Sequence, residues 1–264
     1  MNKIAVIYTT FLRDELMNKT ICSIMRFFGY NWEVFIGDQN EEIPVDKQVK
    51  YNHLKYYILP YDCGLSYARN YLVQKAQELE FKYCLLTADS IEFTSKYDFN
   101  PHIEFLESDP KNALIGFQLN NRVPWEFNLK YVPGDSFYLE ASNDYGNYKD
   151  KSYHKTDICK NFFLAKTEVL AKIKWDNELK LQEHTDFFWR LKQEGYNCYH
   201  SKDISANYID SKPPEYKIMR DRMTSEFNNL FMKKYNIKDW IKYSKEARQI
   251  FFEFNLKRRQ TNDY

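Results

Sequence analysis

The sequence predicts a mixed α/β fold with a mostly parallel central sheet and helices on both faces. Two observations carry this prediction. Short runs rich in β-branched and aromatic residues alternate with helix-length segments over the first 120 residues, an order typical of parallel sheets. The chain has 264 residues, of which 44% are hydrophobic, so it is long enough to bury one large core and a small appendage.

The predicted elements of the first half follow from the spacing of apolar residues. Short apolar runs predict strands, and apolar residues three and four apart predict helices, the first of which ends near Gly29. In chain order we expect a strand at 4–8, a helix at 14–28, strands at 32–38 and 55–59, a helix at 65–79, and strands at 82–86 and 113–119.

The second half begins irregularly and ends in helices. Residues 120–153 are rich in Asn, Tyr, Asp, Pro and Gly, and long connections of this kind are often functional. Pro213 and Pro214 mark a break, after which the chain is helical in character. We therefore expect regular structure at 162–170, a helix from 183, a strand at 204–209, helices from 215, a domain of residues 1–210 and a C-terminal helical extension of residues 211–264.

Charge and cysteine usage exclude several functional classes. The 38 basic and 37 acidic residues give a net charge of +1, so no global field attracts nucleic acid and none is expected as a partner. The five cysteines include no Cys-x-x-Cys pair, which argues against a disulfide framework or a zinc site and favours a reducing compartment. No secretory or membrane-spanning segment is recognisable, so we expect a cytoplasmic protein.

Acid/base side chains cluster where a helix is predicted to begin. Glu183, His184 and Asp186 lie within four residues and are followed by Phe187 and Phe188, which would anchor the helix in the core. A catalytic base must be held rigidly within hydrogen-bond reach of its proton, and a helix start provides such support. The alternative is an acidic first turn that complements the helix dipole.

Two further carboxylates end predicted strands. Asp38 follows the second strand and Asp89 follows the fourth. Because ligands bind at the carboxyl ends of strands in parallel sheets, both are candidate binding residues. Capping of a turn is the alternative for each.

Four segments of the first half resemble the nucleotide-sugar half of family-2-like glycosyltransferases with the GT-A fold. That family shows a strand with Thr-Tyr-Asn-Arg, an Asp after the second strand, Gly-x-x-x-Ala-Arg-Asn, and a strand ending in an Asp-x-Asp-type motif. The matching segments are IYTTFLR at 7–13, FIGD at 35–38, DCGLSYARN at 62–70 and LLTADSIEF at 85–93.

The second half is similar to the ganglioside-type β-1,4-N-acetylgalactosaminyltransferases and their bacterial relatives. The similarity rests on KTDICKNFFLAKT at 155–167, WDNELK at 175–180 and EHTDFF at 183–188. Together the resemblances cover roughly residues 3–210. They imply a nucleotide-sugar half at 1–120 and an acceptor half at 121–210.

The resemblance implies roles for individual residues. Thr10 and Arg13 would lie by the nucleotide, and Asp38 would accept a hydrogen bond from a base such as uracil. Asp89 would face the ribose or a metal-bound diphosphate. Local structural roles stay open: a turn for Gly64 and a helix carboxylate as partner for Arg69. The implied donor site consists of Thr10, Arg13, Asp38, Gly64, Arg69 and Asp89.

Two departures from the family pattern affect the metal. Where relatives have several acidic residues, this chain has Ala88-Asp89-Ser90, and the stretch at 204–208 lacks the usual His. Mg²⁺ and Mn²⁺ prefer oxygen ligands, mostly carboxylates. Three readings stay open: a metal held by Asp89, a domain that only binds, and a metal-independent enzyme that uses Arg190, Lys202 or Tyr208 against the diphosphate.

The identity of the catalytic base is also open. Where inverting relatives have a Glu-Asp pair with Asp as the base, this chain has Glu183 and His184. A histidine is a competent base near neutral pH, so either residue is a candidate. Asp186 would contact the acceptor or the helix start. The acceptor groove is expected along 120–153 and the Asn161-Phe162-Phe163 segment.

The resemblance thus implies transfer of a sugar, with inversion, from a UDP-linked donor to a glycan hydroxyl in bacterial capsule or lipopolysaccharide synthesis. Two alternatives stay open: a non-catalytic nucleotide- or glycan-binding module, and a transferase of another nucleotide-activated group. Aromatics interleaved with Lys and Arg after Glu215 suggest either contact with the inner face of the membrane or packing on the domain.

Overall fold

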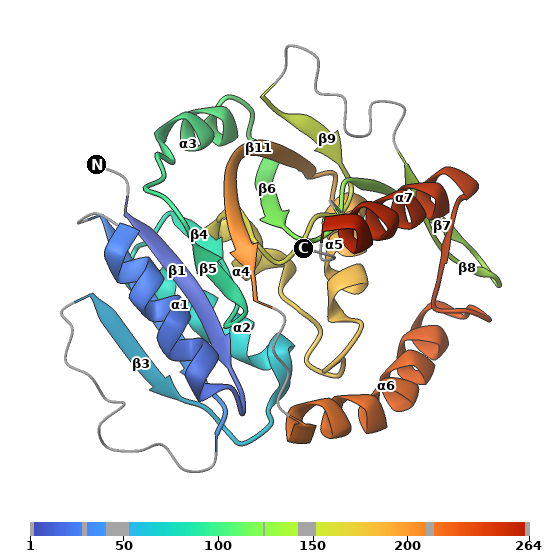
Figure 1. Cartoon of the computed structure of the whole chain (residues 1–264), viewed down its shortest axis with the longest axis horizontal. Coiled ribbons are helices and arrows are strands. Elements are labelled where there is room, and N and C mark those ends of the chain that lie inside the picture. The colour runs from blue at the N-terminus through green and yellow to red at the C-terminus, as the bar shows by residue number, and fades with distance from the viewer. Residues whose placement is uncertain are drawn as a thin grey trace.

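The computed structural model describes residues 3–27, 31–40, 53–123, 125–141, 152–209 and 214–261. A central sheet is flanked by helices on both faces (Figure 1), as the sequence predicted. The strand order is β3-β2-β1-β4-β10-β6-β11-β5, with β9 paired to β11. The strands and helices of the first half are β1 (Ile4–Thr10), α1 (Asp14–Phe27), β2 (Trp32–Asp38), β3 (Leu54–Ile58), α2 (Gly64–Glu78), β4 (Tyr83–Leu86), β5 (Ile91–Phe93), α3 (Asn100–Glu107) and β6 (Asn112–Asn120).

The first four strands form the parallel part of the sheet. β1 is buried along its whole length, and its alternate side chains face two hydrophobic clusters. Ala5 and Ile7 pack in the cluster that contains α2, whereas Val6 and Tyr8 pack in the cluster that contains α1. Burial on both faces explains why β1 has a continuous apolar run rather than an alternating pattern.

The second half adds antiparallel pairing that the local sequence pattern did not indicate. β10 (Phe163–Lys166) lies between β4 and β6 and is antiparallel to both. β11 (Asn197–Tyr208) is parallel to β6 and antiparallel to β5 and β9 (His154–Thr156). Strand insertion from later in the chain depends on long-range packing, which spacing within one segment does not encode.

The expectation of an irregular segment at 120–153 was wrong for its described middle part. β7 (Phe127–Val132) and β8 (Ser136–Ala141) form an antiparallel hairpin whose turn uses Gly134 at φ +74°. Phe127, Leu129, Phe137 and Leu139 alternate inward and are buried. The period-two pattern was therefore present, but the polar and turn-forming neighbours obscured it. Residues 142–151 lie outside the described part of the chain.

The C-terminal extension packs on the rest of the molecule. α6 (Pro214–Tyr235) inserts Phe231 beside Phe137, and α7 (Lys245–Thr261) stacks Phe251 on Phe127 with ring centroids 5.6 Å apart. Between them, β12 (Ile241–Tyr243) runs parallel to β8. The domain boundary near residue 210 stays a prediction. Among the described helices, none has the length and apolarity needed to cross a bilayer.

Candidate functional site

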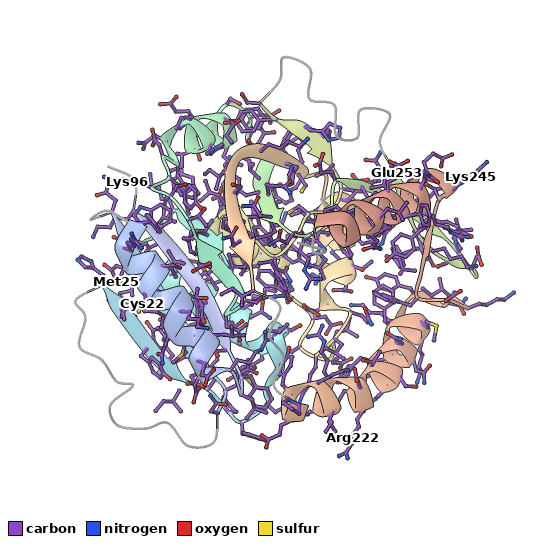
Figure 2. All side chains as sticks on the ribbon, viewed as in Figure 1. Cys22, Met25, Lys96, Arg222, Lys245 and Glu253 are labelled. Atoms are coloured by element: carbon purple, nitrogen blue, oxygen red, sulfur yellow. The ribbon has the colours of Figure 1, made fainter. Side chains whose placement is uncertain are left out.

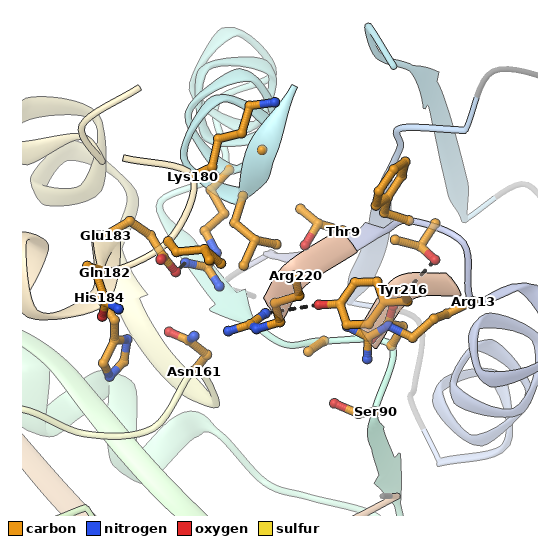
Figure 3. A pocket seen from close by; sticks show the side chains of 18 of the residues that line it. Thr9, Arg13, Ser90, Asn161, Lys180, Gln182, Glu183, His184, Tyr216 and Arg220 are labelled. Atoms are coloured by element: carbon orange, nitrogen blue, oxygen red, sulfur yellow. Dashed lines mark hydrogen bonds and ion pairs between the residues drawn. The ribbon is translucent and has the colours of Figure 1, made fainter. Parts of the chain in front are cut away.

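A cavity of about 400 Å³ opens where β1 and β4 end. Its walls come from segments far apart in the sequence: the β1 and β4 ends, the starts of α2 and α5 (Glu183–Gln193), the loop before β10, and α6. This is the edge of a parallel sheet at which ligands are expected. Figure 3 shows the cavity, with Arg13 and Tyr216 at one end, Glu183 and His184 at the other, and Arg220 between them.

An ion pair occupies the strand end below α6. Arg13 Nη1 lies 2.9 Å from Asp89 Oδ1, and the Thr10 hydroxyl lies 3.5 Å from Asp89 Oδ2. Burial raises the pKa of Asp89 to about 6, against the opposing effects of Arg13 and Thr10. The Tyr216 ring of α6 covers the Arg13 guanidinium at 4.0 Å. Three predicted donor residues are thus brought together.

A second buried ion pair joins α2 to α5. Arg69 Nη1 lies 2.9 Å from Glu183 Oε1, and both side chains are nearly inaccessible to solvent. Burial lowers the pKa of Arg69, and Glu183 opposes that effect. The helix-carboxylate partner considered for Arg69 is therefore present, and both groups still line the cavity.

The start of α5 is held in an uncommon backbone conformation. Gln182, the residue before the helix, has φ +69°, a left-handed value that costs energy for a non-glycine residue. Its side-chain amide donates to Asn228 of α6. Contacts from α6 therefore support the turn that directs Glu183 and His184 into the cavity.

Gly64 opens the α2 side of the cavity. It has φ +87°, and a Cβ atom there would lie 2.8 Å from Lys180 Cγ. Its N–H donates to Gln39 Oε1 at 2.8 Å. Lys180 in turn pairs with Asp62 at 2.7 Å. Both the turn and the close approach require glycine at this position.

His184 lies in an apolar and cationic corner. Burial lowers the pKa of His184 to about 3, and Arg69 and Lys160 contribute to the same effect. Its ring lies 4.9 Å from that of Phe188 and 5.5 Å from that of Trp125. The imidazole is therefore neutral at physiological pH, and it is a poor proton acceptor here.

Several polar atoms around the cavity are buried without a hydrogen-bond partner among the described residues. They are Arg13 Nε, Arg69 Nε, His184 Nδ1, Asn161 Oδ1 and Trp240 Nε1. Unpaired buried polar atoms are costly, so such atoms in a cavity wall favour a polar ligand. Lys160 lies over the Trp125 ring at 4.2 Å beside them.

Two predicted site residues do not line the cavity. Asp38 is fully buried below it, where it accepts hydrogen bonds from the Tyr56 hydroxyl and, at 2.9 Å, from the Asn40 N–H. Asp186 is also fully buried. Its Oδ2 accepts a hydrogen bond from Arg190 at 2.7 Å, and its Oδ1 accepts from the Tyr235 hydroxyl at 2.7 Å and from Lys234.

Of the other residues assigned to the site from the sequence, some line the cavity and others do not. Phe162 and Phe163 are wholly buried in the core, so they do not line a groove, whereas their neighbour Asn161 does. Arg190 is taken up by Asp186 and by backbone carbonyls, and Lys202 is not among the residues of the cavity. Tyr208 lines the cavity as expected, with Arg122 3.8 Å from its ring centre.

Two curated relatives are similar to this chain in sequence. β-1,4 N-acetylgalactosaminyltransferase 1 of Rattus norvegicus is 25% identical over 201 residues, and β-1,4 N-acetylgalactosaminyltransferase 2 of Mus musculus is 24% identical over 190 residues. The matches cover 70% and 71% of this chain but 35% and 36% of the relatives. The chain thus spans about a third of the length of the curated relatives it matches. No family model matches.

Solved structures show the fold. S. aureus TarS 1-349 in complex with UDP superposes with a TM-score of 0.55 and 17% identity, covering 88% of this chain and 72% of the TarS 1-349 chain. GalNAc-T7 with UDP, GalNAc and Mn²⁺ superposes with a TM-score of 0.62 and 12% identity, covering 90% of this chain and 55% of GalNAc-T7. The chain has the GT-A fold. The fold and the resemblance to β-1,4-N-acetylgalactosaminyltransferases inferred from the sequence are confirmed.

The residues present do not fit a carboxylate-bound metal of the GT-A type. Asp89 is the carboxylate at the strand end, and Arg13 already occupies one of its oxygens. Across the described residues there is no group of three or more His, Cys, Asp or Glu side chains arranged to hold a metal ion. Divalent cations in such sites prefer several oxygen ligands. No catalytic step is therefore assigned to a metal in this chain.

Sequence reasoning missed the contribution of α6 and the residues around Asn161. Tyr216 and Arg220 both line the cavity, and Arg220 Nη1 donates to the Tyr216 hydroxyl at 3.0 Å. Their i, i+4 spacing indicated a shared helix face. Nothing in that spacing indicated that the face covers a cavity. Lys160 and Trp125 were missed because their segments have no periodic pattern.

Proposed function

We propose that this chain transfers a sugar from a UDP-linked donor to a hydroxyl group of a glycan acceptor. The observation that carries the proposal is a single cavity that joins the strand-end pair of Arg13 and Asp89 to the carboxylate of Glu183 on α5. The names of the sequence relatives and the UDP bound to the structural neighbours support the same class of reaction.

The proposed reaction is one displacement with inversion. The acceptor oxygen attacks the anomeric carbon from the face opposite the diphosphate. Its proton passes to a carboxylate, and the bond to the nucleotide breaks with the electron pair leaving on the diphosphate oxygen. A base held at the reacting hydroxyl is needed because a neutral sugar hydroxyl is a weak nucleophile.

Glu183 is the proposed base. It lines the cavity, and Arg69 fixes one of its oxygens at 2.9 Å. Of the two candidates, His184 is less suited because its pKa of about 3 reflects an environment that opposes protonation. His184 instead offers its unpaired Nδ1 to a hydrogen-bond donor, such as a sugar hydroxyl or amide.

The proposed acceptor side lies around Trp125 and Asn161. Aromatic rings pack against the apolar faces of sugars, and the unpaired Asn161 Oδ1 accepts a hydroxyl hydrogen bond. The donor side lies near Thr10, Arg13 and Gly64, below which Asp38 supports the turn. A glycan of a bacterial surface polysaccharide is the acceptor class we propose.

A transfer assay tests this function. The protein is incubated with a panel of UDP-linked sugars and short glycan acceptors, and the acceptors are analysed by mass spectrometry for a gain of one sugar. The proposal predicts a gain with at least one pair and none with Glu183→Gln. The anomeric configuration of the product, read by NMR, tests inversion. Transfer only from a nucleotide-activated alditol would indicate the other transferase class, and nucleotide binding without transfer would indicate a binding module.

A further inference from the structure

The cavity is lined by more cationic than anionic side chains. Five cationic side chains and three carboxylates line it. Three ion pairs account for all the carboxylates, namely Arg13 with Asp89, Arg69 with Glu183, and Lys180 with Asp62. Two cations, Lys160 and Arg220, form no ion pair with a carboxylate among the described residues, although Glu183 acts on Arg220 at longer range.

The contacts of these two cations are compatible with a ligand. Arg220 is bound to the neutral hydroxyl of Tyr216, and Lys160 lies over the neutral ring of Trp125. Neither contact cancels the charge. Burial and Arg122 lower the pKa of Lys160 to about 7, which is the response of a buried amine that lacks an anion.

We propose that Arg220 binds the diphosphate of the donor in place of a metal ion, and that Lys160, on the Trp125 side of the same cavity, adds positive charge that favours the diphosphate. This inference rests on the proposed function. The diphosphate of a nucleotide sugar carries one negative charge on each phosphate, and two unpaired cations match it. Arginine binds phosphate oxygens through two parallel N–H groups, and lysine binds them as a point charge.

Arg13 occupies the carboxylate that a metal ion would need. Its guanidinium lies 2.9 Å from the strand-end carboxylate that a metal would need, and the Tyr216 ring holds it from above at 4.0 Å. A divalent cation at Asp89 would therefore have to displace a charged side chain that is fixed on two sides. Tyr216 also positions Arg220 through its hydroxyl, so this residue of α6 contacts both Arg13 and Arg220.

The position of Arg220 fits a role at the centre of the reaction. Figure 3 shows it between Tyr216 and Asn161, with Glu183 beyond. Charge that develops on a departing diphosphate is stabilised most by donors already in place. Arg220 lines the cavity and is solvent-exposed in the structure.

Calorimetric titration of UDP and uridine tests the proposal in EDTA and in Mn²⁺, with no dependence on turnover. We expect UDP to bind in EDTA, with Mn²⁺ changing the affinity by less than about twofold. Arg220→Gln and Lys160→Met should each weaken UDP binding by about tenfold or more, as expected for loss of a charged hydrogen bond, and leave uridine binding unchanged. Arg222→Gln is the matched control, because Arg222 projects outward from the same helix (Figure 2).

Three outcomes would overturn the inference. Binding of UDP that requires Mn²⁺ would mean that a metal supplies the charge and that Arg13 moves away from Asp89, while the proposed transferase function would stand. Equal losses for Arg220→Gln and Arg222→Gln would remove Arg220 from the subsite. Failure of every nucleotide diphosphate to bind under either condition would overturn the proposed function as well.

Discussion

At the scale of residues, the environment of each group decides the assignment between Glu183 and His184. Both lie at the same helix start and both line the cavity. Arg69 stabilises the carboxylate of Glu183, whereas burial and nearby cations oppose a charge on His184. Proton transfer to the carboxylate neutralises a charge, whereas transfer to the imidazole would create a cation beside Arg69 and Lys160, so Glu183 is the better proton acceptor.

The base assignment predicts unequal effects of two substitutions. Glu183→Gln keeps the shape and a hydrogen bond to Arg69 but removes the base, so kcat should fall by about 100-fold or more with little change in donor affinity. His184→Gln should act mainly on acceptor KM. Steady-state kinetics of both variants distinguish the roles, and the assignment is wrong if His184→Gln carries the larger loss in kcat.

Protonation of Lys160 predicts a pH dependence of nucleotide binding. Its pKa of about 7 means that the amine is charged below that pH and neutral above it. Asp89, with a pKa of about 6, gains negative charge over a neighbouring range, so both groups weaken anion binding as pH rises. UDP affinity should fall roughly fivefold between about pH 6 and pH 8.

The variant Lys160→Met isolates the contribution of the amine. Calorimetric titrations across the same pH range should show that the fall above pH 7 is lost, because Arg220 stays charged and His184 stays neutral. An unchanged slope in Lys160→Met would assign the titration to another group, such as Asp89.

At the scale of elements, α5 and α6 are joined by a buried carboxylate. Asp186 of α5 is fully buried and binds Lys234 and Tyr235 of α6. Asp186, which the sequence analysis placed in the catalytic cluster, is therefore bound by residues of the fold rather than facing the cavity. Through this contact, α6 is held where Tyr216 and Arg220 reach the cavity.

Substitution of Asp186 should therefore act on stability. Asp186→Asn removes a fully buried carboxylate, so that half-buried Arg190 loses its carboxylate partner and Lys234 keeps only Asp176. We expect the free energy of unfolding to fall by about 2 kcal/mol, the value for lost hydrogen bonds between charged groups. Denaturant titration measures this change. The exposed Asp221 of α6 provides the control, and Asp221→Asn should change stability by less than about 0.5 kcal/mol. Equal effects of the two substitutions would contradict a structural role for Asp186 in joining α5 to α6.

At the scale of the whole molecule, the sequence predicted the parallel half of the sheet well, because each buried strand there is a continuous apolar run. It did not predict β10 between β4 and β6, since β10 pairs with β4 residues 77 to 83 positions away and with β6 residues 47 to 51 positions away. Thr10, Arg13, Gly64, Arg69, Asp89 and Glu183 were correctly expected near one another, because motif positions at strand ends converge in this fold.

The rest of the site could not be predicted, for identifiable reasons. Asp38 and Asp186 look like Asp89 in the sequence, and only their surroundings show that they are buried away from the cavity. Arg220 belongs to a helix whose placement is fixed by contacts with Phe137 and Asp186, which no local pattern encodes. The sequence thus indicated which side chains carry acid, base or charged groups, but not which of them face the cavity.

The proposed function requires that this cavity break the bond between a sugar and a nucleoside diphosphate. Release of UDP from a panel of UDP-linked sugars, followed over hours without added acceptor, measures this most directly, since water replaces the acceptor. We predict slow release from at least one donor, unaffected by EDTA and reduced to the buffer rate by Glu183→Gln. Tight binding of the same donors with no release above the buffer rate would contradict the claim and identify the chain as a binding module.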